Sequence, residues 1–413
     1  MKETKFKNTE IGKIPEEWKM YSIGKDCSVK ARIGWQGLTT SEYLQTGHYG
    51  LITSTDLIEG KVNWDTCVFV SEERYKQDTN IIVKNGDVLV SKDGTIGKVA
   101  VVSNLQYPTT LNSGVFVIRT KNEKITQEGL GLVFISPYFK DFIKRLTAGS
   151  TIVHLYQKDI VNFTFPIPTL PEQHHIASAL TSMDNLISSL GKLIEKKKNI
   201  KQGTMQQLLT GKTRLKGFSE RWVYRKISEI ATTSSGGTPS RSIPSYYYGD
   251  IKWFTTTELK DNYLYDSVEH ITREALSNSS AKMFSANTIL MAMYGATIGK
   301  LGILKEPSAT NQACCAIKCN DIDEIFLFYI LLYNRKSIIE KGCGAGQPNI
   351  SQTIVNELSF LVPPCKKEQQ AIANILSKMD NEITALEAKR AKYEAIKQGM
   401  MQQLLTGKIR LIS

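Results

Sequence analysis

The sequence predicts two mixed α/β (α+β) domains separated by long helices, with the helices pairing as an antiparallel coiled coil. Three observations carry this prediction. A long segment occurs twice, each copy has apolar residues at heptad spacing, and the stretches between the copies are weakly similar. A chain of 413 residues is long enough for two or three domains. The repeat is too widely spaced for a solenoid, so it indicates one unit of about 200 residues used twice.

The repeated segment runs from Pro168 to Leu215 and again from Pro364 to Leu411. The copies align without a gap, more than half of the aligned residues are identical, and both contain MQQLLTGK. The similarity extends to the start of each domain, where Trp18 matches Trp222. The expected boundaries are 1–168 for the first globular domain, 169–213 for the first helical spacer, 214–364 for the second globular domain and 365–413 for the second spacer.

Each spacer starts beside prolines and stops at a glycine. Proline is tolerated in a first helical turn, which places the starts near Pro171 and Lys366, while Gly211 and Gly407 suit C-terminal stops. An isolated helix would leave its narrow apolar seam exposed, so we expect the two seams to pair. The seam residues are Ile176, Leu180, Met183, Ile187 and Leu190 in the first copy, and Ile372, Leu376, Met379, Ile383 and Leu386 in the second.

The lengths favour antiparallel pairing. A helix of about 38 residues is about 57 Å long, whereas a domain of about 150 residues has a radius of gyration near ~15 Å. Parallel helices would require the second domain to lead the chain back along the whole helix, and antiparallel helices need no such return. We therefore expect one globular domain at each end of the pair, related by an approximate two-fold axis.

The globular stretches contain short runs of β-branched residues separated by Gly, Asn and Asp, which is typical of strands and tight turns. The runs in the first stretch lie at 68–70, 81–83, 88–90, 99–102 and 115–118. Helical spacing predicts a helix at 130–146 and a matching one at 326–339. Weak similarity between the stretches, such as 89–102 with 291–304, predicts a shared scaffold with diverged surfaces.

Composition bounds the class of protein. The net charge of +12 and the pI of about 9.1 favour a polyanionic partner, most simply nucleic acid. The seven cysteines include no C-x-x-C pair, and ACCAIKC (313–319) is typical of a buried strand with structural thiols. A polar N-terminus and the absence of a run of 18 apolar residues lead us to expect a soluble, cytoplasmic protein.

Signals for catalysis are weak. GCGAG (342–346) resembles a loop that cradles S-adenosylmethionine, but such loops follow strands and the stretch before it is typical of a helix. Asp87, Lys92 and Asp93 are close enough in sequence to suggest a nuclease metal site, yet nothing equivalent occurs in the second half and both stretches suit hairpin turns. His174 and His175 suit exposed positions in a first helical turn. We therefore expect no catalytic, cofactor-binding or metal-binding residues.

Turn-bounded segments rich in basic, amide, hydroxyl and aromatic side chains occur in both halves and suit DNA recognition. Lys and Arg position a protein on phosphates, and Arg, Asn and Gln read base edges through paired hydrogen bonds. The candidates in the first half are Arg32, Trp35, Thr53, Thr55, Lys92, Thr95, Lys98, Asn112, Thr151, His154 and Tyr156. Those in the second half are Thr238, Arg241, Tyr246, Thr256, Lys260, Tyr294, Thr297, Lys300, Asn311, Gln347 and Asn349.

This arrangement resembles the specificity subunit of type I restriction–modification systems over essentially the whole chain. The resemblance is carried by IPEEW (14–18), GSTIVHLYQKDI (149–160), GAGQPNIS (344–351), the hinges PIPTLPEQ (166–173) and VPPCKKEQ (362–369), and MQQLLTGK in both copies. The second hinge departs from the first, with Cys365 followed by two lysines where the first has Thr169 followed by Leu and Pro.

The resemblance implies that each globular domain is a target-recognition domain for one half of a bipartite, asymmetric DNA sequence, and that the coiled coil sets the gap between the halves. It also implies a non-catalytic subunit. Two modification subunits would supply S-adenosylmethionine and adenine N6 methylation, and two restriction subunits would supply translocation and cleavage with ATP and Mg²⁺. The residues leave two alternatives: a coiled-coil scaffold with two protein-binding heads, and a stand-alone methyltransferase resting on GCGAG.

Overall fold

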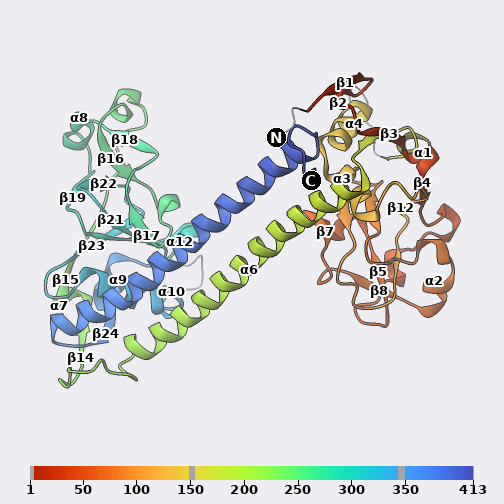
Figure 1. Cartoon of the computed structure of the whole chain (residues 1–413). Coiled ribbons are helices and arrows are strands. Elements are labelled where there is room, and N and C mark those ends of the chain that lie inside the picture. The colour runs from red at the N-terminus through yellow and green to blue at the C-terminus, as the bar shows by residue number, and fades with distance from the viewer. Residues whose placement is uncertain (1–3, 148–153, 343–348, 413) are drawn as a thin grey trace. The chain divides into compact units, whose positions relative to one another are not determined.

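The computed structural model describes residues 4–147, 154–342 and 349–412, and the chain divides into two compact units (Figure 1). Unit 1 comprises Met1–Leu190 and Lys389–Ser413, and unit 2 comprises Gly191–Ala388. Two long helices, α6 (Leu170–Leu209) and α12 (Lys366–Leu404), each contribute one half to either unit. Unit 1 is therefore built from both ends of the chain, and unit 2 from one continuous stretch.

The globular part of unit 1 is a mixed α/β domain. Its main sheet has the order β4-β12-β9-β10-β7-β6, a second sheet has the order β11-β5-β8, and two-stranded ribbons join β1 to β2 and β13 to β3. The elements are β1 (Phe6–Thr9), β2 (Gly12–Pro15), β3 (Lys19–Ser22), α1 (Ile23–Asp26), β4 (Cys27–Lys30), β5 (Tyr49–Ile52), β6 (Leu57–Ile58), β7 (Gly60–Val62), β8 (Val68–Val70), α2 (Glu72–Lys76), β9 (Val88–Ser91), β10 (Val99–Val101), β11 (Thr109–Leu111), β12 (Val115–Thr120), α3 (Gln127–Ile135), α4 (Pro137–Thr147), α5 (Gln157–Ile160) and β13 (Thr164–Ile167).

The main sheet of unit 1 is buried on both faces at its centre. Val88 and Val90 of β9 pack in one core cluster, with Phe134 of α3, while Leu89 packs in the other. Successive side chains of a strand point to opposite faces, which is why neighbours enter different clusters. Burying each such aliphatic side chain stabilises the domain by about 1.5–3 kcal/mol. The same burial explains why β9 is a continuous apolar run instead of an alternating one.

Unit 2 repeats this frame. Its main sheet has the order β15-β23-β20-β21-β17 and its second sheet the order β18-β16-β22-β19. Each main sheet contains one parallel pair, β7 with β10 in unit 1 and β17 with β21 in unit 2. Each second sheet also contains one, β5 with β11 in unit 1 and β16 with β22 in unit 2. The ribbon β14-β24 corresponds to β13-β3. The elements are β14 (Val223–Lys226), α7 (Ile227–Ile230), β15 (Ala231–Ser235), β16 (Ile251–Phe254), β17 (Asn262–Leu264), β18 (Glu269–Ile271), α8 (Arg273–Ser277), β19 (Met283–Phe284), β20 (Ile289–Ala292), β21 (Leu301–Leu304), β22 (Ser308–Thr310), β23 (Cys314–Cys319), α9 (Glu324–Tyr333), α10 (Arg335–Lys341), α11 (Gln352–Glu357) and β24 (Ser359–Val362).

Most of the expected elements are confirmed, and three differ. The helix expected at 130–146 is two helices, because Ser136 is extended (φ −73°, ψ 164°) ahead of Pro137 and the residue before a proline disfavours helix. The helix expected at 326–339 is likewise broken, at Asn334 between α9 and α10. The strand expected at 81–83 is wrong: Thr79–Ile81 is a 3₁₀ turn, and the Asn80 backbone N–H donates to the capping Asp78 carboxylate at 2.9 Å.

The cysteine-rich strand is confirmed as β23, and its first two thiols, Cys314 and Cys315, are fully buried. Burial raises the pKa of both thiols to about 12. They are therefore neutral at physiological pH and fill the core as small apolar groups.

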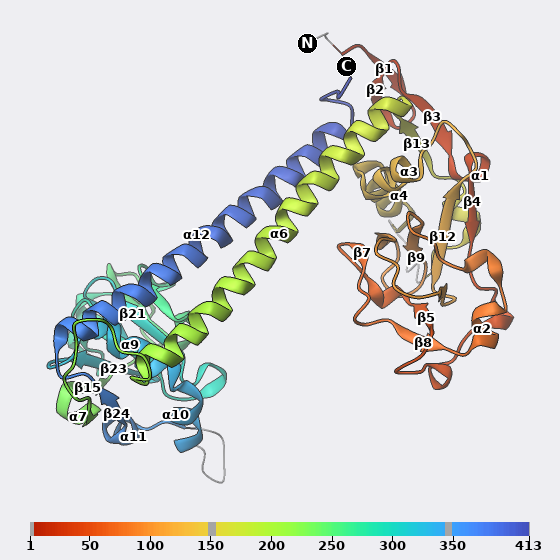
Figure 2. The same cartoon turned by 60° about the horizontal axis from the view of Figure 1, so that its bottom comes forward.

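In unit 1 the first half of α6 packs against the second half of α12. Ile176 and Leu180 form a buried cluster with Leu404 and Leu405, and Lys397 Nζ donates to Asp184 at 2.7 Å. In unit 2 the roles are exchanged: Lys201 of α6 donates to Asp380 of α12. Within each unit, residues early in one helix thus meet residues late in the other, so the pairing is antiparallel, as expected (Figure 2).

The partners of the seam residues differ from the simplest expectation. Ile372 and Leu376 do not meet a second heptad seam but pack with Met205, Leu208 and Leu209, which belong to the MQQLL stretch of α6. The complementary MQQLL stretch covers Ile176 in unit 1. Leu190 and Ile383 are also buried, while Met183, Ile187, Met379 and Leu386 are half-buried.

Both long helices begin and end close to the expected residues. Gly211 and Gly407 both have φ +70°, a left-handed conformation that favours glycine after a helix. Two basic residues of α6, Lys197 and Lys198, pair with Glu382 and Glu387 of α12 at 2.6 Å within unit 2. No helix in the described ranges is long and apolar enough to cross a membrane.

Candidate nucleic-acid interface

In each unit a capped turn follows one strand of the second sheet, β5 in unit 1 and β16 in unit 2. In unit 1, after β5, the backbone N–H and Oγ1 of Thr53 donate to the Asp56 carboxylate at 2.8 and 2.9 Å. In unit 2, after β16, Thr255 makes the same two bonds to Glu258 at 2.7 and 2.9 Å. This reciprocal capping fixes the turn. The exposed Thr55 joins it, with its Oγ1 2.7 Å from Thr53 Oγ1.

An asparagine stands beside this turn in both units. The backbone N–H of Asn112 donates to Ile52 O at 2.9 Å, and that of Asn311 donates to Phe254 O at 3.0 Å. The Asn112 side chain also donates to the hydroxyl of Tyr43 at 2.6 Å. The two asparagines therefore occupy corresponding places, next to the turn that follows β5 or β16.

A further loop joins this surface in unit 1. The loop after β9 carries Lys92 and Asp93, and Leu155 N–H donates to Lys92 O at 2.7 Å. His154 Nδ1 lies 2.6 Å from Asp93 Oδ1. Tyr156 is 55% exposed next to them, with Lys158 Nζ 5.4 Å from its ring centroid. Thr53, Lys92, Asn112, His154 and Tyr156, all candidates from the sequence, thus lie on adjoining segments of unit 1.

The corresponding loop of unit 2 follows β20. Ile350 N–H donates to Met293 O at 2.7 Å, and Tyr294 and Asn349 form an isolated β-bridge. The Thr238 hydroxyl donates to Gln312, the neighbour of Asn311. The Oδ1 atom of Asn311 is buried and, among the described residues, accepts no hydrogen bond.

Two sequence candidates do not belong to the surface. Arg32 is 1% exposed and donates to Leu111 O at 2.9 Å and to Thr110 Oγ1 at 3.2 Å. Desolvation lowers the pKa of this guanidinium, which is the signature of a buried structural cation. Tyr246 is 6% exposed and its hydroxyl accepts a hydrogen bond from Asn278 at 3.2 Å. Nothing in the local sequence distinguishes these side chains from exposed loop residues.

Arg241 lies on the surface but is held in place. Its guanidinium donates to both carboxylate oxygens of Glu269, at 2.5 and 2.7 Å, and lies 4.1 Å from the ring centroid of Tyr247. The hydrogen bonds from Arg241 lower the pKa of Glu269. Lys300 is also engaged, with its Nζ 3.2 Å from Asp261. These cations are anchored within unit 2 and would have to exchange partners to bind phosphate.

The remaining candidates are distributed as follows. Thr55, Thr95 and Lys260 are exposed, and Lys98, Thr256 and Thr297 are half-buried. Thr151, Gln347 and the side chain of Trp35 lie outside the described residues. Sequence reasoning missed Tyr43, Asp93 and Gln312 as surface partners. Asp93 was interpreted as a hairpin residue, and its proximity to His154 depends on two segments about sixty residues apart in sequence.

The stretches considered for catalysis have structural roles where they are described. The Asp87 carboxylate accepts two hydrogen bonds from Arg119, at 2.7 and 2.5 Å, and one from the Lys84 backbone at 2.8 Å, which fixes the turn before β9. Over the described ranges no group of three or more His, Cys, Asp or Glu residues could hold a metal ion. A helix, α10, precedes Gly342 as expected, and the rest of GCGAG lies outside the described residues.

The junction between domain and helix is built alike in both units. In unit 1 the buried Glu172 accepts from Trp18 Nε1 at 3.0 Å and from Arg410 at 2.6 and 2.8 Å. In unit 2 Glu368 accepts from Trp222 Nε1 at 3.3 Å and from Arg214 at 2.7 and 2.9 Å.

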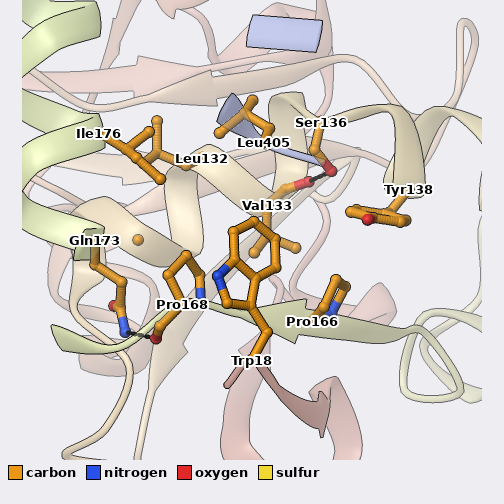
Figure 3. A pocket seen from close by; sticks show the side chains of 11 residues that line it. Trp18, Leu132, Val133, Ser136, Tyr138, Pro166, Pro168, Gln173, Ile176 and Leu405 are labelled. Carbon is orange, nitrogen blue, oxygen red and sulfur yellow. Dashed lines mark hydrogen bonds between the residues drawn. The ribbon is translucent and has the colours of Figure 1, made fainter. Parts of the chain in front are cut away.

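One position of the junction differs. Gly129 and Phe326 both lie three residues after the N-cap of their helix, α3 or α9. The Phe326 ring packs edge-on to Trp222 at 6.4 Å, whereas unit 1 has a pocket beside Trp18 with about 320 Å³ of free space, part of it open to solvent (Figure 3). The pocket is lined by apolar groups, including Leu132, Ile176 and Leu405. Gly129 is one of the residues that line it.

The fold and its surfaces define a class of protein: related α/β domains, each carried on an antiparallel helix pair and each presenting its own polar loops. The family model described as "Type I restriction modification DNA specificity domain" matches residues 15–202 and 219–398. The chain therefore belongs to the family of type I restriction–modification specificity subunits, and its two domains are target-recognition domains.

Known proteins agree with this assignment. The MjaVIII specificity subunit of Methanocaldococcus jannaschii is 27% identical over 99% of this chain and 97% of its own length. The StySPI specificity subunit of Salmonella potsdam is 21% identical over 88% of this chain and 82% of its own length. The crystal structure of a type I S subunit from M. genitalium has the same fold, with a TM-score of 0.60 at 15% identity over 94% of this chain and 96% of that chain.

Proposed function

We propose that this subunit recognises a bipartite DNA target, with one half-site read by each domain. The observation that carries the proposal is the repeated frame of the loops. In each unit a capped turn, an asparagine and a bridged loop pair lie at corresponding positions, but the side chains that face solvent differ. Two similar frames with different exposed side chains suit two related but unequal DNA sequences.

The charge of the chain supports a DNA target over a protein partner. The net charge of +12 is suited to phosphate neutralisation, which makes binding weaken steeply as salt rises. Exposed aromatic and amide groups on the same loops, such as Tyr156 and Asn349, suit contacts to base edges.

We further propose that the helical regions dock two modification subunits and two restriction subunits, and that this subunit itself has no catalytic role. The partners would supply S-adenosylmethionine for adenine methylation, and ATP and Mg²⁺ for translocation and cleavage. The support is the family membership together with the structural roles of Asp87 and Arg119 described above.

The test is selection of sequences from a pool of randomised DNA duplexes. The full chain is used alone and together with a type I modification subunit from the same host. The expected result is two blocks of specified bases separated by an unspecified gap, with retention that falls steeply between about 50 and 200 mM salt. If no duplex is retained under either condition, the heads bind something else, and the scaffold alternative gains.

The spacer role has a separate test. One heptad inserted after Leu190 in α6, with a matching heptad before Lys389 in α12, preserves the helical register and lengthens the pair by about 10 Å. At about 3.4 Å per base pair this corresponds to about three base pairs of added gap. The half-sites should stay the same. A change in the half-sites at constant gap would contradict the division between reading domains and spacer.

A further inference from the structure

An isolated β-bridge occupies the same place in the frame of each unit. It joins Asp93 to His154 in unit 1 and Tyr294 to Asn349 in unit 2. The bridges are anchored identically. In unit 1 the Lys92 N–H donates to Gly114 O at 2.9 Å, and Lys92 O accepts from the Leu155 N–H at 2.7 Å. In unit 2 the Met293 N–H donates to Ala313 O at 2.9 Å, and Met293 O accepts from the Ile350 N–H at 2.7 Å. The backbone thus holds two side chains next to each other at one defined point of each domain.

The bridged side chains differ in chemistry although their backbones correspond. Unit 1 has an imidazole and a carboxylate 2.6 Å apart, with the two side chains 53% and 37% exposed. Unit 2 has a phenol, 39% exposed, and an exposed amide. Exposure of this extent excludes a core-packing role. The loop is held by the backbone hydrogen bonds of Lys92 and Leu155, so the exposed side chains of His154 and Asp93 are available for other contacts.

The bridge of unit 1 lies in the middle of the polar loops. A Cβ atom placed on Gly114 would lie 3.4 Å from Asp93 Oδ2 and 3.6 Å from Asn112 Oδ1, so the carboxylate and the amide flank the same glycine. On the other side the rings of His154 and Tyr156 have centroids 6.2 Å apart. Acceptor, donor and aromatic groups are therefore contiguous around the bridge.

We propose that the bridged pair is the specificity-determining position of each domain, so that Asp93 with His154, and Tyr294 with Asn349, each select one base pair of a half-site. This inference rests on the DNA recognition proposed above. An aspartate accepts a hydrogen bond from an exocyclic amino group, as on cytosine N4, and asparagine pairs with N6 and N7 of adenine. The two pairs thus suit different bases at the same point of a shared docking geometry.

The test transplants one pair into the other frame. The double variant Asp93→Tyr with His154→Asn gives unit 1 the pair of unit 2. Full-length variant and parent, each with the modification subunit, are compared by selection from randomised duplexes. The expected result is altered preference at one position of one half-site, with discrimination changed about 10-fold or more. The other half-site and the gap should not change.

A matched control makes the same exchange at an ordinary surface ion pair. Glu72 and Lys76 of α2 are 2.6 Å apart, with side chains 56% and 67% exposed. The variant Glu72→Tyr with Lys76→Asn should leave both half-sites unchanged. If this control shifts a half-site as much as the transplant does, the bridge has no special role and the inference is wrong.

The outcomes separate the inference from the function on which it rests. A transplanted protein that still selects the parental half-sites overturns the inference and leaves bipartite recognition intact. A parent protein that selects no sequence overturns both. If circular dichroism shows that the double variant does not fold, Asp93→Asn replaces it, since the substitution removes the charge and keeps the shape. Relaxed discrimination at one base pair supports the inference, and unchanged discrimination overturns it.

Discussion

The two units have matching side chains where each domain joins its helix, and different side chains on their loop surfaces. At the junctions a tryptophan and an arginine donate to a buried glutamate in both units, around Glu172 and Glu368. At the loop surfaces the backbone hydrogen bonds match, but a hydrogen-bonded histidine and aspartate in unit 1 correspond to a phenol and an amide in unit 2. The repeat is therefore kept where a helix must be anchored to a domain, and lost where side chains meet solvent.

This comparison separates a mechanical part of the molecule from a variable part. A buried carboxylate is tolerated when its hydrogen bonds are satisfied, so each member of the junction constrains the others. An exposed loop side chain has no such constraint, because water replaces any partner that is lost. The following variants test this separation, from the largest expected effect to the smallest.

The largest effect is expected where the junctions themselves differ. Phe326→Ala removes a fully buried ring beside Trp222 and leaves unit 2 with the kind of pocket that unit 1 has beside Trp18. A buried Phe→Ala substitution costs about 3–5 kcal/mol. Urea denaturation followed by tryptophan fluorescence measures it. Phe6→Ala, at a residue 41% exposed, serves as the control and should cost less than about 1 kcal/mol. Equal effects would show that Phe326 is not part of a packed core.

The next effect concerns the charge of the junction. Arg410→Met leaves Glu172 buried with the Trp18 bond alone, and such a loss costs about 3 kcal/mol. Arg214→Met should cost less, because the Arg214 side chain is 28% exposed and that of Arg410 only 7%, so water can reach the second site more readily. The two unfolding free energies are compared directly. Adding Glu172→Gln to the first variant should recover part of the loss; no recovery would contradict an electrostatic origin.

A smaller effect is expected from the ion pairs between the helices. Lys397→Ala removes the contact to Asp184 in unit 1, and Lys201→Ala removes the contact to Asp380 in unit 2. Partly exposed pairs of this kind are worth about 0.2–1 kcal/mol. Thermal denaturation at low and high salt measures the effect, which should shrink in high salt because the charges are screened. A salt-independent loss would point to the packing of the lysine stem instead of its charge.

The smallest effect is a pH dependence in unit 2. Hydrogen bonds from Arg241 hold the pKa of Glu269 below its usual value. A depressed pKa in the folded state means that the pair stabilises the fold above the unfolded glutamate pKa of about 4.3, and that this contribution is lost as pH falls through the folded value. Glu269→Gln should therefore be less stable than the parent at pH 7, by under about 1 kcal/mol. The difference should shrink by pH 3, and a constant difference would exclude titration as its cause.

The sequence predicted the fold through features that are periodic. The heptad seams, the prolines and glycines at the helix ends and the short β-branched runs all report local geometry, and they placed the starts of α6 and α12 within a residue. The break at Ser136 was missed because apolar spacing continues across it. Pairing of the seams with the MQQLL stretches was also missed, since a periodic pattern gives the face of a helix but not its partner.

The candidate site was predictable only in part. Loop composition identified Asn112, His154 and Tyr156, which the frame does bring together. It failed for Arg32, because an arginine in a polar loop looks the same in sequence whether it faces water or the carbonyl of Leu111. Burial of a charged side chain depends on contacts between distant segments, and these are a property of the assembled fold.

The division of the chain into its units has a consequence for synthesis. Unit 2 is continuous, from Gly191 to Ala388, while unit 1 also needs residues from Lys389 onward. At about 5–20 residues per second, a ribosome takes about 10–40 s to cover the roughly 200 residues that separate the two parts of unit 1. During that interval the first domain waits with Glu172 still lacking Arg410, and unit 2, although made later, is the first to have all its parts. The order of completion is thus the reverse of the order of translation.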